Sequence, residues 1–145
     1  MSENKQSLIK AKDIMSEYVV VIRENMKINE VAHLMLRDRV SGFPVVDATK
    51  KVVGIVTLTD LFMMIDKADH AGHKELEKQI EKFKSLPVSE VMSRGVITIT
   101  SSTTLDEIIS LYVRKRVHTF PVMEDNKLVG IIGRHDILNA TFHLM

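Results

Sequence analysis

Apolar and polar positions along this chain follow a pattern that occurs twice. Each copy has a short β-branched run, a segment with apolar residues at spacings of three and four, two more apolar runs around a polar turn, and a second amphipathic segment. Short β-branched runs predict buried strands, and spacings of three and four predict helices with one apolar face. We therefore expect the order strand–helix–strand–strand–helix in each half.

In the first copy, strands are expected at residues 19–22, 45–46 and 52–56. A helix lies between the first two strands, and another helix opens at residues 57–60 after the third strand. The apolar face of the first helix is formed by Ile28, Val31, Ala32, Met35 and Leu36.

The second copy repeats the first at an offset of 77 residues, which relates Pro121 to Pro44 and Met92 to Met15. After the later turn the offset is 76, and a turn is where a repeat tolerates a deletion. Thr104 and Glu107 have the spacing of a capping box, which predicts a helix start. The corresponding helix face is Leu105, Ile108, Ile109, Tyr112 and Val113.

The repeat divides the chain into four segments. We expect an N-terminal arm at residues 1–10, a first repeat at 11–66, a connecting loop and amphipathic helix at 67–87, and a second repeat at 88–145. Each half is too small to bury its apolar faces well alone. We therefore predict an α/β (α+β) fold, a pseudo-twofold pair of β-α-β-β-α repeats packed through their sheets. The alternative is two independent domains on a linker.

The composition is ordinary and excludes several classes of function. The 145 residues are 45% hydrophobic and 27% charged, with a formal net charge of +1, so we expect no nucleic-acid partner. No apolar run approaches the roughly 18 residues of a membrane span, and the polar residues 1–12 do not form a signal peptide. The absence of cysteine excludes disulfides and thiolate chemistry, and the cytoplasm is the simplest expected location.

The chain resembles a tandem pair of CBS domains, a family named after cystathionine β-synthase. The resemblance rests on Asp-Ile-Met at 13–15, Gly-Phe-Pro-Val-Val at 42–46 and Gly-Ile-Val-Thr-Leu-Thr-Asp at 54–60. In the second half it rests on Glu-Val-Met at 90–92, Phe-Pro-Val at 120–122, and the segment from Gly130 to Asp136.

This resemblance implies a free-standing regulatory module rather than an enzyme. Pairs of this family form two clefts between their halves, and the clefts commonly take AMP, ADP, ATP or S-adenosylmethionine. The resemblance also implies signalling by conformational change, through the module's own oligomer or through an unidentified protein partner.

Two residues of the first copy suit the ribose of such a ligand. The Asp60 carboxylate can accept hydrogen bonds from the ribose hydroxyls, and the Thr57 hydroxyl can add to that contact. The nearby helix N-terminus favours anions. On the residues alone, Thr57 and Asp60 can instead cap the helix without a ligand, and both roles can hold at once. The match to the ribose pattern of the family favours the ligand.

Other candidates would hold the base and the phosphate. The resemblance implies that His118, helped by Arg116, reaches the phosphate of a ligand whose ribose Thr57 and Asp60 hold; a surface histidine is the alternative. The adenine would be recognised mainly by backbone groups, from residues that can equally be ordinary core. These candidates are Val20, Val21, Ile22, Gly42, Phe43 and Pro44.

The second copy keeps only half of the ribose pattern. Gly133 stands where Thr57 stands, so the hydroxyl is lost, whereas Asp136 remains. We expect a second site that is weaker or empty. Its candidate residues are Ile97, Thr98, Thr119, Phe120, Pro121, Arg134, His135 and Asp136.

Neither a catalytic nor a metal site is expected. The chain has no enzyme signature motif, and His70 and His73 lack further ligands at metal spacing. The helices that follow the two aspartates carry outward apolar residues, Phe62, Met63 and Leu138, which predict a homodimer. The alternative function is a structural or dimerisation module with empty clefts that acts through protein–protein contact.

Overall fold

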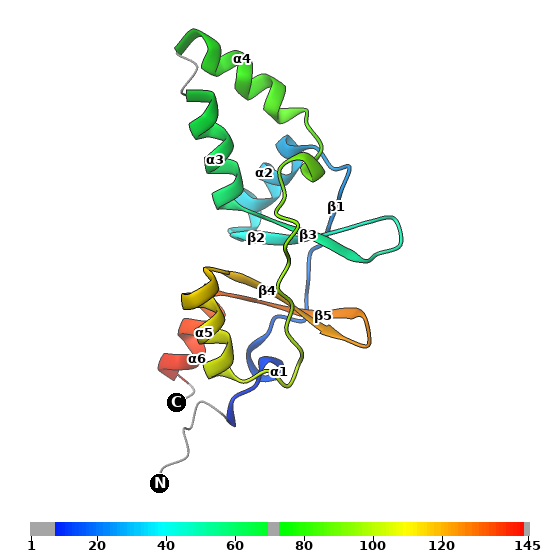
Figure 1. Ribbon diagram of the computed structural model, residues 1–145, viewed down its shortest axis with the longest axis vertical. Helices are drawn as coiled ribbons and strands as arrows, with labels where there is room; N and C mark the ends of the chain where they lie inside the picture. The colour runs from blue at the N-terminus through cyan, green and yellow to red at the C-terminus, as the bar shows by residue number, and fades with distance from the viewer. Residues whose placement is uncertain (1–7, 70–72, 144–145) are drawn as a thin grey trace. The chain divides into compact units, whose positions relative to one another are not determined.

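The computed structural model describes residues 8–69 and 73–143 (Figure 1). The elements of the first half are α1 (Ala11–Ile14), β1 (Ile22–Arg23), α2 (Ile28–Asp38), β2 (Gly42–Val46), β3 (Val52–Thr57) and α3 (Leu58–Asp69). The second half contains α4 (His73–Lys84), a 3-10 turn (Val88–Glu90), α5 (Leu105–Lys115), β4 (Thr119–Glu124), β5 (Lys127–Gly133) and α6 (Arg134–His143). The predicted mixed α/β class, with two β-α-β-β-α units, is confirmed.

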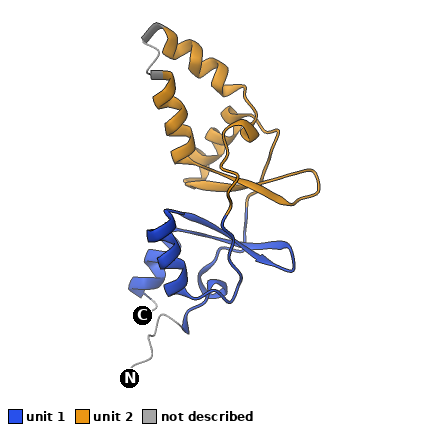
Figure 2. Ribbon diagram, viewed as in Figure 1, with its two compact units in different colours: residues 1–19, 97–145 blue, residues 20–96 orange. Residues whose placement is uncertain are grey.

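The chain forms two compact units that each take one segment from the other repeat (Figure 2). Unit 2 is Val20–Val96, and unit 1 contains the described residues of Met1–Val19 and Ile97–Met145. Ser16 exchanges backbone hydrogen bonds of 2.9 and 3.0 Å with Ile131 in unit 1. Ser93 and Ile55 form the equivalent pair in unit 2, at 2.8 and 2.9 Å. The predicted packing of the repeats through their sheets stays a prediction.

Unit 2 is built on the three-stranded sheet β1-β2-β3. β2 and β3 are antiparallel and place Gly42 opposite Thr57, whereas β1 runs parallel to β2 and pairs Ile22 with Val45. The prediction of a buried strand at residues 19–22 was therefore wrong in extent. Strand pairing begins only at Ile22, which is fully buried, and Val21 is 41% exposed. A β-branched run alone does not show where its partner strand ends.

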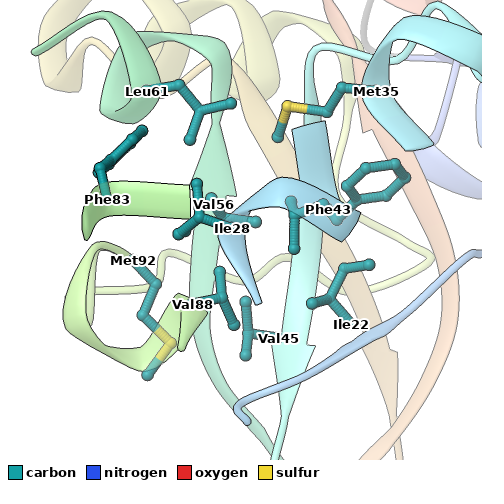
Figure 3. Packing of buried hydrophobic residues seen from close by; sticks show 11 residues of the cluster. Ile22, Ile28, Met35, Phe43, Val45, Val56, Leu61, Phe83, Val88 and Met92 are labelled. Atoms are coloured by element: carbon teal, nitrogen blue, oxygen red, sulfur yellow. The ribbon is translucent and has the colours of Figure 1, made fainter. Parts of the chain in front are cut away.

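The core of unit 2 joins residues from its sheet, its helices and the start of the second repeat (Figure 3). Burying each large apolar side chain contributes about 1.5–3 kcal/mol. Val88 and Met92 belong to this core, so the start of the second repeat helps to stabilise the unit that contains the first. The cluster consists of Ile22, Ile28, Val31, Met35, Phe43, Val45, Val56, Leu61, Phe83, Val88 and Met92.

Unit 1 repeats this plan around the antiparallel pair of β4 and β5. Ile99 forms a parallel bridge with Val122 where unit 2 has β1. The predicted capping box at the start of α5 is confirmed, because Glu107 N donates to Thr104 Oγ1 at 3.4 Å and Thr104 N donates to Glu107 Oε2 at 3.3 Å. The core is Ala11, Ile99, Leu105, Ile108, Phe120, Val122, Ile132, Ile137 and Ala140.

The predicted apolar faces of α2 and α5 are correct at their first turns and wrong at their last positions. Ile28 and Met35 are buried, but Leu36 is 77% exposed, and its counterpart Val113 is 68% exposed. At 100° per residue, Leu36 lies roughly 80° around the helix from Ile28, which takes it to the edge of the buried stripe. No helix in the described part of the chain is long and apolar enough to cross a membrane.

Candidate functional site

The turn from β3 into α3 holds Asp60 in a capping box. Thr57 N donates to Asp60 Oδ2 at 2.8 Å, and the Thr57 hydroxyl donates to the same oxygen at 3.2 Å. In return, Asp60 N donates to Thr57 Oγ1 at 3.4 Å. These bonds satisfy backbone donors at the helix start. The cap is thus present, and the ribose role of the same two residues stays a prediction.

The second oxygen of the Asp60 carboxylate faces a serine that sequence reasoning missed. Ser93 Oγ donates to Asp60 Oδ1 at 3.3 Å. The paired backbone bonds between Ser93 and Ile55 fix the position of the serine. The signal for Ser93 is present in the sequence, since a Met-Ser dipeptide occupies positions 15–16 and 92–93 of the two repeats, but its partner is 33 residues away in the chain.

A glycine lets the segment that carries Ser93 lie close to β3. A Cβ atom on Gly54 would lie 2.5 Å from Met92 Sδ and 3.0 Å from the backbone oxygen of Ser93. Both contacts are shorter than a normal van der Waals separation. The absence of a side chain at Gly54 is therefore what allows Met92 to pack here and Ser93 to reach Asp60.

The arrangement around Asp60 is suited to recognising hydroxyl groups. An ionised carboxylate only accepts hydrogen bonds, and each oxygen has about two acceptor positions. The cap occupies Oδ2 with two donors, while Ser93 is the one donor to Oδ1 among the described residues. Asp60 is only partly buried, so Oδ1 has capacity for one further donor.

The predicted adenine-binding residues lie in the same unit as Asp60, but most of their side chains belong to the core. Ile22 and Phe43 are buried, and Gly42 and Pro44 lie within the buried strand β2. These residues have only backbone groups to offer a ligand. Val20 is partly buried and Val21 is exposed.

The corresponding turn in unit 1 keeps the backbone cap and loses the hydroxyls. Gly133 N donates to Asp136 Oδ2 at 2.8 Å, as Thr57 N does to Asp60. The hydroxyl of Ser16, the counterpart of Ser93, donates to the Tyr18 carbonyl oxygen at 3.3 Å instead of to the aspartate. The two carboxylates therefore differ in the partners of both oxygens.

The predicted phosphate-binding residues lie in unit 1. The His118 ring stacks on Tyr112, with ring centroids 4.4 Å apart and an interplanar angle of 26°. Arg116 is exposed and ends α5 with φ 54°, in the left-handed region. Because these residues and Asp60 belong to different units, their approach to a common ligand stays a prediction.

The other candidates for the second site divide into buried and exposed groups. Thr119, Phe120 and Pro121 are buried in β4. Ile97 is partly buried, whereas Thr98, Arg134 and His135 are exposed. Binding of a ligand by this set stays a prediction.

An apolar groove of about 290 Å³ lies between α5 and α6 of unit 1. Leu138, which is 54% exposed, forms part of its wall, and Phe142, one turn further along α6, is 74% exposed. The prediction that the helices after the two aspartates expose apolar residues is confirmed at Leu138, Phe62 and Met63. The lining residues are Ile109, Tyr112, Arg134, Ile137, Leu138 and Thr141.

Other polar clusters of the described residues do not add to the site. No group of three or more potential metal ligands occurs among them. Of the two histidines considered as metal ligands, His70 and His73, the first lies outside the described residues. Hydrogen bonds from the Thr49 hydroxyl and the Lys51 backbone lower the pKa of Asp47. Hydrogen bonds from the Ser101 hydroxyl and backbone lower the pKa of Glu124. Asp47 accepts from the backbone of its own turn, and Glu124 accepts from the backbone of Ser101.

Gly133→Thr is expected to stabilise the protein by about 0.5–1 kcal/mol, which raises the melting temperature by about 1–4 °C. A Cβ atom here would lie 3.8 Å from Asp136 Oδ2, an ordinary contact, and the new hydroxyl can donate to Asp136 as Thr57 does to Asp60. Thermal unfolding followed by circular dichroism measures the change. Gly133→Val has the same shape without the hydroxyl, and equal stabilisation by valine would contradict the capping explanation.

Comparison with known proteins adds family information to this geometry. The model of the CBS domain family matches residues 11–67 and 88–143 of the chain. The chain is 25% identical over 141 residues to the CBS domain-containing protein CBSX1, chloroplastic, of Arabidopsis thaliana, covering 86% of this chain and 59% of that protein. It spans 24% to 59% of the length of four curated relatives, CBSX1 among them.

Two solved structures with bound ligands resemble the chain. The structure of CBSX2 in complex with AMP has a TM-score of 0.74 and 25% identity, and the match covers 94% of this chain and 98% of that one; CBSX2 is likewise from Arabidopsis thaliana. The CBS domain pair of protein MJ0100, in complex with 5′-methylthioadenosine and S-adenosyl-L-methionine, has a TM-score of 0.71 and 26% identity, covering 91% and 98%. All three ligands contain an adenosine with a ribose diol.

Proposed function

Because the chain belongs to the CBS domain family, we propose that it is a regulatory module that binds an adenosine-containing ligand at Asp60. AMP, ADP, ATP and S-adenosylmethionine are the ligands we propose, and none is required as a catalytic cofactor. The observation that carries this proposal is the Asp60 carboxylate, whose Oδ2 is held by the helix cap while Oδ1 retains acceptor capacity.

Three parts of the ligand are assigned to three groups of residues. Asp60, with Thr57 holding it in place, accepts hydrogen bonds from the ribose. The backbone of β1 and β2 and the partly buried Val20 meet the adenine. His118 and Arg116 meet the phosphate. Ligand binding changes the conformation because the ligand has a higher affinity for one of two states. A separate protein partner responds to this change in conformation.

A thermal-shift screen tests this function. AMP, ADP, ATP, S-adenosylmethionine and 5′-methylthioadenosine are each added at millimolar concentration. A ligand present at a hundred times its dissociation constant stabilises the folded state by about 2.7 kcal/mol, which corresponds to a rise in melting temperature of roughly 5–10 °C. A melting temperature that none of the five ligands raises would contradict the proposal.

The apolar groove supports a second candidate function, a dimerisation module that acts with empty clefts. Contiguous apolar surface that is rimmed by polar residues is typical of protein–protein contacts. Unit 1 exposes Leu138 in the wall of the groove and Phe142 one turn further along α6, and unit 2 exposes Leu36, Phe62 and Met63 on the corresponding helices. We propose that a second copy of the chain covers the groove, whether or not a nucleotide binds.

Leu138→Glu is expected to shift the protein from dimer to monomer at micromolar concentration, because the charge would be buried against the apolar groove of the partner copy. Sedimentation equilibrium measures the mass. Asn139→Glu introduces the same charge at the next position of α6, which is exposed and outside the groove lining, and is expected to remain dimeric. A monomeric native chain would contradict the dimer, and equal masses for both variants would contradict its formation through the groove.

The proposal gives the protein no catalytic role of its own. The ligand acts as a regulator, and the cysteine-free sequence is compatible with the reducing cytoplasm that we propose as its location. To test the non-catalytic role, each of the five adenosine ligands is incubated with the protein and then analysed by chromatography. We expect every ligand to be recovered chemically unchanged.

A further inference from the structure

We propose that Ser93 and Asp60 together form a pair that recognises the ribose diol, with one hydroxyl donating to Asp60 Oδ1 and its neighbour donating to Ser93 Oγ. This inference rests on the proposed function, and it assigns ligand selectivity to a residue outside the Thr-x-x-Asp pattern. The two acceptor atoms are 3.3 Å apart, near enough for two hydroxyl groups on adjacent ring carbons to donate one to each.

The hydrogen-bonding capacity of the pair matches two hydroxyl donors. The single Ser93 proton points to Asp60 Oδ1, so the serine oxygen presents only its lone pairs to a ligand. Asp60 Oδ2 accepts from the backbone and side chain of Thr57. The Thr57 proton is therefore committed to the cap, and Ser93 is the hydroxyl beside Oδ1 that has acceptor capacity.

Ser93 is positioned before any ligand arrives. Its backbone is fixed by the two hydrogen bonds with Ile55, and the preceding Met92 is buried against Gly54. A hydroxyl held this way loses little conformational freedom when a ligand binds. The exposed side chain of Ser93 is accessible to a ligand, and it contributes nothing to the hydrophobic core.

The other repeat provides an internal comparison. Ser16 has the same paired backbone bonds, with Ile131, and Met15 lies against Gly130 as Met92 lies against Gly54. The Ser16 proton nevertheless goes to the Tyr18 carbonyl, so Ser16 and Asp136 do not form the pair. The difference predicts diol selectivity at Asp60 only, and Ser16→Ala is the matched control.

The test compares AMP with its 2′-deoxy and 3′-deoxy analogues by isothermal titration calorimetry. The native protein is expected to prefer AMP over each analogue by about tenfold or more, since a site built to bind a hydroxyl discriminates against its absence. Ser93→Ala is expected to weaken AMP binding by the factor by which the native protein prefers AMP over one analogue, about tenfold. The affinity for that analogue is expected to stay unchanged, so the preference over it is lost. Ser93→Thr, which keeps the hydroxyl, and Ser16→Ala are expected to retain native selectivity.

The outcomes separate this inference from the function on which it rests. If the native protein binds AMP but Ser93→Ala weakens AMP and both analogues by the same factor, Ser93 has only a structural role and the inference is wrong. An unchanged affinity for AMP in Ser93→Ala has the same meaning. If the native protein binds none of the three nucleotides, the nucleotide-binding function fails and this inference fails with it.

Discussion

Asp60→Ala is expected to weaken AMP binding at least about tenfold, because the substitution removes a charged acceptor for the ribose hydroxyls. A hydrogen bond to a charged group contributes about 1.5–3 kcal/mol, which corresponds to factors of about 10 to 150 in the dissociation constant. Calorimetric titration of native and variant protein with AMP measures this factor directly.

The same substitution also removes the cap of α3, so loss of binding has to be separated from loss of structure. Asp60→Asn retains a side-chain oxygen that can accept from Thr57 N and removes the charge. We expect it to fold as the native protein does and to bind AMP more weakly. Asp136→Ala removes the corresponding cap in unit 1, and its melting temperature shows how far the loss of a cap alone lowers stability. Equal affinities for AMP in the native protein and both Asp60 variants would contradict the ribose assignment.

Gly54→Ala is expected to lower the free energy of unfolding by about 1–3 kcal/mol, the usual effect of an extra group in a packed interior. The added Cβ would overlap Met92 Sδ at 2.5 Å and press on the Ser93 backbone oxygen at 3.0 Å. Relief of these contacts requires the segment that carries Ser93 to move away from β3. Urea denaturation measures the stability, and we expect AMP affinity to fall in parallel.

Gly95→Ala provides the matched control for this prediction. A Cβ atom at Gly95 meets nothing within 4 Å, so the same chemical change is expected to leave both stability and AMP affinity unchanged. If Gly54→Ala were as stable as Gly95→Ala, the close packing of Met92 on β3 would not be what positions Ser93.

Most of the fold follows from local patterns in the sequence. The duplication, the helix of Ile28–Asp38 and the capping box of Thr104 and Glu107 depend on neighbouring residues, and each is confirmed. The amphipathic helix predicted within the connecting segment 67–87 is present as His73–Lys84. Local periodicity determines these elements because the residues that it relates lie within one or two helical turns.

The features that the sequence did not predict depend on long-range partners. The strand at residues 19–22 was predicted too early because its pairing is limited to Ile22 and Arg23, opposite Val45 and Val46. The spacing of apolar residues placed Leu36 on the buried face of its helix, but it is 77% exposed. Periodicity gives the direction of the apolar face and not the width of the surface that packs on it. The first residues of each repeat belong to the unit that contains the strands of the other repeat. This arrangement depends on the backbone pairing of Ser16 with Ile131 and of Ser93 with Ile55.

Only the part of the candidate site that depends on neighbouring residues was predicted. Thr57 and Asp60 are three residues apart and form the predicted cap, so a local motif was sufficient to find them. Ser93 completes the surroundings of Asp60 from 33 residues away. The two turns differ in more than the hydroxyl lost at Gly133, since the hydroxyls of Ser16 and Ser93 also have different partners. A weaker or empty second site stays a prediction.

A crystal structure of the protein grown with AMP would show which residues hold the ribose. We expect an AMP molecule whose ribose hydroxyls lie within hydrogen-bond distance of Asp60 Oδ1 and Ser93 Oγ. Full occupancy is expected at this turn, with lower occupancy or none at Asp136. AMP bound only at Asp136, or at Asp60 through groups other than the ribose, would contradict ribose recognition by Asp60 and Ser93.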